Sequence, residues 1–200
     1  MPEQLQLFDD EPAPGSREAE TTTKDFEQHV QRLLETMKDR VKFKILVWGP
    51  SLRSKSQVAE KRRDIYRKLK EEKHHCWFSE EFIVPSGYTL KSYELTQAAL
   101  VDMIILLVEA DAPGSLGEMH DFCSHKELLH KILLFFPETL RRGYAAHGLV
   151  RDLEKGYRNV EYYLEIDITS CRVLTIVLEW VQARRSYVFS NTPLSVSSGE

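Results

Sequence analysis

The sequence has few cysteines, no long apolar run and no strong excess of charge of one sign. Its three cysteines, Cys76, Cys123 and Cys171, are odd in number and widely spaced, which excludes a disulfide scaffold and a paired-cysteine metal site. The longest apolar run, residues 103–108, is much shorter than the ~18 residues that a membrane span needs. With 27 basic and 31 acidic residues, the charge gives no reason to expect direct binding of nucleic acid.

The composition instead fits a globular protein, since 42% of the 200 residues are hydrophobic. The first residues lack the basic and apolar segments of a signal peptide, so we expect a cytoplasmic protein in which the cysteines are small buried side chains. Residues 1–20 and 191–200 are poor in large apolar side chains and are predicted to be disordered tails. Residues 21–190 are predicted to form a single domain.

Apolar segments that alternate with helical patterns predict the fold. Because these segments are apolar on both faces, they indicate a parallel sheet that helices cover on both sides, in three layers. The expected fold is α/β and Rossmann-like, with the flavodoxin-like strand order 2-1-3-4-5. The five predicted strands are residues 43–48, 76–78, 102–109, 132–136 and 160–166. The predicted helices include residues 23–39, a helix capped by Ser56, and residues 93–99, 117–130 and 170–184.

Folds of this type bind ligands beyond the carboxyl ends of the first and third strands. The loop after the third strand contains Asp111, Gly114, Ser115, Gly117 and Glu118. The serine is a candidate helix cap, the glycines permit a close approach, and the glutamate is expected in the first helical turn. The alternative is that the glutamate only complements the helix dipole.

The loop after the first strand supplies a second group of candidates. Gly49, Pro50 and Ser51 permit a close approach, and Arg53 offers a phosphate contact. Here the alternative is an ordinary solvated turn. The basic residues of 61–73 are expected to lie on the wet face of their helix.

Two segments are similar to a known family. Residues 45–50, Ile-Leu-Val-Trp-Gly-Pro, resemble the opening strand of nucleoside 2-deoxyribosyltransferases, and residues 102–118 resemble their strand, Gly/Ser turn and catalytic glutamate. The same layout occurs in the related nucleotide-processing proteins called SLOG-like and, more distantly, in TIR domains. The second segment also looks like effectors of retron-type phage defence.

This resemblance implies cleavage or transfer at an N-glycosidic bond. It places Glu118 as the catalytic carboxylate and Asp111 as a second acid near it. NAD or a related nucleotide is then the substrate, with no separate cofactor, and anti-phage defence is the expected setting. Trp48 is a candidate for stacking on the base, although such aromatic residues more often belong to a core.

Two other functions stay open: a nucleotide sensor without catalysis, and an interaction subunit of a larger defence complex. The apolar stripe of residues 26–37 favours the second, because a sheet of this type does not need a helix before its first strand. We therefore expect another chain, in a homo-oligomer or as a partner protein, to cover this stripe; the alternative is packing against the domain's own sheet. The histidines near Cys123 lack a second ligand pair, so no metal is expected.

Overall fold

Five parallel strands form the centre of the protein, whose computed structural model describes residues 15–143 and 148–191. The strand order is β2-β1-β3-β4-β5, so the predicted flavodoxin-like order is confirmed. The central strands β1, β3 and β4 are apolar on both faces and almost wholly buried, as parallel strands in a three-layer fold must be. The strands are β1 (Lys44–Trp48), β2 (His75–Phe78), β3 (Met103–Leu107), β4 (Ile132–Pro137) and β5 (Val160–Tyr163).

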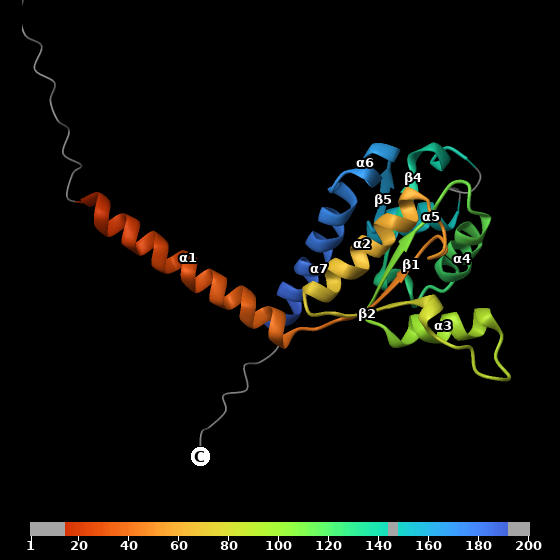
Figure 1. Cartoon of the computed structure of the whole chain (residues 1–200), viewed down its shortest axis with the longest axis horizontal. Coiled ribbons are helices and arrows are strands. Elements are labelled where there is room, and N and C mark those ends of the chain that lie inside the picture. Colours follow the sequence, from red (N-terminus) through yellow and green to blue (C-terminus); the bar gives the residue numbers. More distant parts are fainter. Residues whose placement is uncertain (1–14, 144–147, 192–200) are drawn as a thin grey trace, which may run out of the picture.

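Helices cover both faces of this sheet, and Figure 1 shows them with the sheet between. Alternate side chains of β1 enter two different apolar clusters: Ile45 and Val47 contribute to the one with α2 and α7, whereas Leu46 and Trp48 contribute to the one with α4 and α5. The helices are α1 (Gly15–Arg40), α2 (Gln57–Glu71), α3 (Leu90–Leu100), α4 (Pro113–Cys123), α5 (Leu149–Tyr157), α6 (Glu165–Thr169) and α7 (Arg172–Asn191). The 3-10 turns are η1 (Ser79–Glu81), η2 (Leu129–Lys131) and η3 (Glu138–Leu140).

α1 differs from the other long helices because most of it projects away from the rest of the protein (Figure 1). Near its carboxyl end Met37 is buried and the helix contacts α7, but the side chain of Phe26 is 67% exposed. The helix begins at Gly15, inside the segment that we predicted as a tail; residues 1–14 and 192–200 lie outside the described part. Among the described residues, no helix is both long and apolar enough to cross a membrane.

Several element boundaries differ from the sequence prediction. α4 begins at Pro113 rather than at 117, because proline is well suited to the first helical position. β5 ends at Tyr163 rather than at 166, because the Leu164 amide donates a hydrogen bond of 2.8 Å to the Asp167 carboxylate and the chain turns into α6. α5 was not predicted. Cys76 and Cys123 are buried as expected, but Cys171 is exposed, so that expectation was wrong for the third cysteine.

Candidate functional site

The carboxyl end of β1 holds four of the predicted ligand-binding residues beside Trp48. Gly49 has φ +152°, and a Cβ there would lie 2.9 Å from the Leu107 carbonyl oxygen, so the close approach of β1 and β3 requires glycine. Pro50 is buried, whereas Ser51 and Arg53 are exposed; the Arg53 amide donates to the Ser51 hydroxyl at 3.3 Å. Two polar side chains of this loop are therefore accessible to a ligand.

Trp48 does not belong to that accessible surface, which corrects the prediction that it stacks on a base. Its side chain is fully buried and its ring is stacked on Phe122 of α4, with 3.6 Å between the ring centroids. It packs there because successive strand residues point to opposite faces, and position 48 faces the α4 side. Its indole Nε1 and the side-chain amide of the buried Gln97 lack hydrogen-bond partners within the described part of the chain.

Arg62 of α2 holds this end of the sheet in place. Its Nε and Nη2 donate to the Val47 carbonyl oxygen at 3.1 and 2.8 Å, and its Nη1 donates to the Pro50 carbonyl oxygen at 2.8 Å. The same guanidinium forms two bonds of 2.7 and 2.6 Å to the carboxylate of Glu80 in η1. The prediction that this basic segment lies on a wet face was wrong for Arg62 and for Lys61, which is also buried and donates to the Ser170 carbonyl oxygen at 2.7 Å. Arg62 is thus committed to protein acceptors and has no donor left for a phosphate.

A cavity of about 350 Å³ lies where β3, β4 and β5 end. The predicted Asp111 lines it, together with Glu109 from the same loop and with Glu165, neither of which was predicted as a site residue. Thr139 and Tyr163 also line it; the hydroxyl of Tyr163 donates to the Val108 carbonyl oxygen. A cavity with three carboxylates suits sugar hydroxyls or a developing positive charge, and it does not suit a phosphate.

A second group of carboxylates lies on the α3 and α4 side of the same edge. Burial raises the pKa of Glu94 in α3, and the negative charges of Glu80 and Asp121 raise it further. For Glu80, burial by itself raises the pKa, but the hydrogen bonds and charge of Arg62 outweigh it, so the pKa lies below its usual value. Asp121 of α4 forms an ion pair of 2.5 Å with Lys91. Burial and the neighbouring negative charges thus favour the protonated form of Glu94, whereas Arg62 favours the ionised form of Glu80.

The predicted catalytic residue lies in the second turn of α4, not in the first as expected, because the helix starts four residues earlier. For the same reason Ser115 is not the helix cap; Ala112 occupies that position and makes no side-chain cap. Gly114 and Gly117 are exposed, and open space surrounds a Cβ built at either one. The side chains of Ser115 and Glu118 lie outside the described part of the structure.

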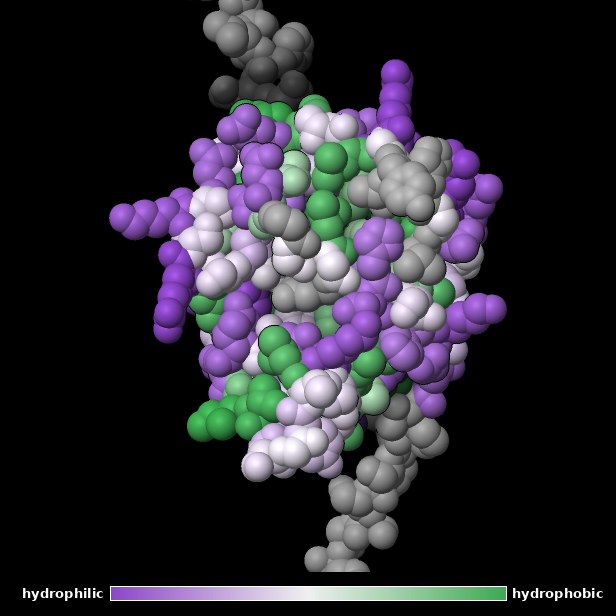
Figure 2. Space-filling model, turned by 90° about the vertical axis from the view of Figure 1, so that its right-hand side faces the viewer, coloured by the Kyte–Doolittle hydropathy of each residue, from purple (hydrophilic) through white to green (hydrophobic). Residues whose placement is uncertain are grey.

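Figure 2 faces this edge of the molecule, where hydrophilic residues surround smaller hydrophobic areas. Among the described residues, no group of three or more histidine, cysteine or acidic side chains is arranged to hold a metal ion. Glu109 and Glu165 each lie two residues beyond the end of an observed strand, at the edge where such folds bind ligands, whereas the predicted strands 102–109 and 160–166 included them. Glu94 had no signal in the sequence, because its pKa is raised by burial and by charges from η1 and α4.

The chain was compared with family models and with curated proteins, and neither comparison gives a match.

Proposed function

We propose that the protein hydrolyses the N-glycosidic bond of a nucleoside or nucleotide, with NAD among the candidate substrates. The proposal also takes from the resemblance that this activity serves defence against phage. The observation that carries it is the concentration of carboxyl groups at the carboxyl edge of the sheet. They comprise the three around the cavity and Glu94 with its raised pKa.

The reaction needs two kinds of carboxyl group. As the bond from the anomeric carbon to the base nitrogen breaks, its electron pair stays on the base and the sugar becomes positively charged. An ionised carboxylate stabilises that charge, and the resemblance assigns this role to Glu118. A second carboxylate can accept a proton from the attacking water, which is a role for Asp111 on the cavity wall. A neutral carboxyl can donate its proton to the departing base, which is a role for Glu94.

The role of Glu94 depends on the base. Adenine leaves a nucleoside as an anion unless it is protonated, whereas nicotinamide leaves NAD as a neutral molecule and needs no proton. A proton donor is therefore useful only for substrates whose base is uncharged while it is attached to the sugar, such as adenosine. This difference makes the two candidate substrate classes distinguishable by one substitution.

The test measures free base by chromatography after incubation of the purified chain with NAD, adenosine or deoxyadenosine. We expect Glu118→Gln to abolish release from every substrate, and Glu94→Gln to slow adenine release by about 10²–10⁴-fold while leaving nicotinamide release unchanged. Asp152→Asn, an exposed acid on α5, is the matched control and should behave as the parent. Release at the parent rate by Glu118→Gln would remove the catalytic assignment.

Thermal unfolding of the same samples distinguishes hydrolysis from the alternative function, a nucleotide sensor without catalysis. A ligand that binds the folded chain stabilises it by about 2.7 kcal/mol at a hundredfold excess over its dissociation constant. Stabilisation without any released base would favour the sensor. If no substrate is cleaved and none stabilises the chain, neither function holds.

A further inference from the structure

The projecting part of α1 carries a set of apolar side chains that the rest of the chain does not cover. Phe26 is 67% exposed and Leu33 is 43% exposed, and Val30 between them is only half-buried. Met37, one turn further along, is buried near α7. The unburied residues are thus those on the part of the helix that extends beyond the rest of the protein (Figure 1).

The spacing of these residues is that of a helix that packs along another helix. Phe26, Val30, Leu33 and Met37 are separated by four, three and four residues, which is the heptad pattern of two-helix packing. Most helical stability in proteins comes from packing of an apolar face, and the projecting part of α1 has no such packing within the described part of the chain. The projecting turns of α1 therefore need a partner along this stripe.

We propose that the partner is α1 of a second copy of this chain. The four positions that flank the stripe are Glu27, His29, Leu34 and Thr36, of which the glutamate is the only acidic residue and none is lysine or arginine. When two copies pack along this stripe, the flanking positions therefore bring no lysine or arginine against another and no acidic side chain against another. This holds whether the two helices run in the same or in opposite directions.

The overall charge of the helix supports the same occupant. Residues 24–40 contain Lys24, Arg32, Lys38 and Arg40 against Asp25, Glu27, Glu35 and Asp39, so the segment has no net charge from these groups. The segment would not attract a strongly acidic or strongly basic partner by charge, whereas a helix with the same apolar spacing can pack along it.

The proposed interface is short, so we expect a weak dimer. The exposed stripe contains Phe26, Val30 and Leu33, and so it buries less than the ~1,200–2,000 Å² of a standard stable interface. The dimer is therefore expected to form reversibly, with a dissociation constant on the order of micromolar.

The test is sedimentation equilibrium of the full chain between about 1 and about 200 μM, a range that brackets micromolar affinity. We expect the mass to rise from 23.3 kDa toward twice that value as concentration increases. The variant Phe26→Ser/Leu33→Ser should remain at the monomer mass throughout. The matched control, Gln28→Ser/Arg32→Ser, changes two exposed residues on the other side of α1 and should dimerise as the parent does.

Circular dichroism and thermal unfolding show whether each variant keeps the folded sheet domain. If the double variant loses it, Phe26→Ser alone replaces it, because that side chain is the most exposed of the stripe. A parent that stays monomeric at every concentration overturns the proposal and leaves another protein as the partner of α1. A double variant that dimerises like the parent overturns it too, because the contact then lies elsewhere. Neither result depends on whether the chain cleaves a nucleotide.

Discussion

Two buried arginines hold opposite ends of the sheet, and they differ in how completely their donors are bonded. Arg62 at the carboxyl edge donates to strand carbonyls and to both oxygens of Glu80. Arg185 of α7 lies at the amino edge, where it donates to the Glu72 carbonyl oxygen at 2.8 Å and contacts His74 Nε2 at 2.5 Å. Its Nε is buried without a partner in the described part of the chain.

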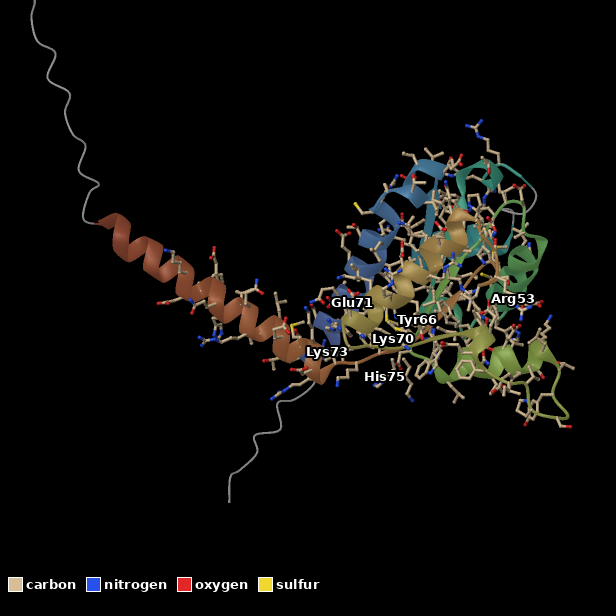
Figure 3. The ribbon with its side chains drawn as sticks, viewed as in Figure 1. Arg53, Tyr66, Lys70, Glu71, Lys73 and His75 are labelled. Atoms are coloured by element: carbon tan, nitrogen blue, oxygen red, sulfur yellow. The ribbon has the colours of Figure 1, made fainter. Side chains whose placement is uncertain are left out.

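The two buried charges are therefore compensated to different degrees. A bidentate carboxylate and backbone acceptors compensate the charge of Arg62, so it fixes the geometry of the loop after β1. Arg185 has a carboxylate contact of only 3.4 Å, to Glu72, and lies against an imidazole. It lines a cavity of about 510 Å³ between α1, α2 and α7. Figure 3 shows Lys73 and His75, which flank the buried His74 in sequence, toward the α1 end of the molecule, and Arg53 farther from it.

Replacement of Arg62, the arginine at the carboxyl edge, should lower the free energy of unfolding the most. Arg62→Leu is expected to lower the free energy of unfolding by about 3–5 kcal/mol, because it leaves buried carbonyl oxygens and Glu80 without their partner. Urea unfolding followed by circular dichroism measures it. Arg67→Leu, an exposed residue of the same helix, is the control and should change the value by no more than about 0.5 kcal/mol. Equal losses in the two variants would contradict the role of Arg62.

The second-largest loss of stability is expected from mild acid, through His74 at the amino edge of the sheet. Burial, then the positive charge of Arg185 and then that of His75 together lower the pKa of His74 to about 4. The unfolded chain, with the ordinary value of 6.5, binds a proton that the folded chain excludes, so stability is fully present above pH 6.5 and falls below it. The expected loss between pH 6.5 and about pH 5 is about 2 kcal/mol.

Urea unfolding across this pH range checks the loss, with His74→Gln as the comparison. The variant should lose the pH dependence that the histidine causes. An unchanged slope would assign the acid sensitivity to other groups.

Arg185→Leu should cost less than Arg62→Leu, about 1–2 kcal/mol, because fewer well-bonded groups lose a partner. It should also weaken the acid effect, since the positive charge that lowers the pKa of His74 is gone. Unfolding at pH 7.5 and near pH 5 measures both changes. A loss larger than that of Arg62→Leu would reverse the comparison between the two ends.

The smallest change is expected from Glu80→Gln, about 1 kcal/mol, since Arg62 keeps its backbone acceptors and the new amide oxygen still accepts a hydrogen bond. The same unfolding assay applies. A loss as large as that of Arg62→Leu would mean that the ion pair, rather than the backbone contacts, carries the stabilisation.

Much of the fold could be predicted from local sequence patterns, but less of the candidate site could be. The central strands are continuous apolar runs, and Ser56 caps α2 as predicted, its hydroxyl accepting from the Ala59 amide at 3.2 Å. Asp111 was predicted at the candidate site and lines the cavity. Glu94 was not found, because its pKa is raised by burial and by charges from two other elements, which only the folded structure brings together.

The strand order could be predicted from the sequence, because apolar period and right-handed crossovers leave few arrangements of five parallel strands. The sequence also determined that α1 is a helix with an apolar stripe. The burial of Trp48 and Arg62 and the exposure of Phe26, in contrast, depend on how the elements pack together. The physical reason is that periodicity shows which residues share a face, whereas what covers that face depends on elements distant in the sequence.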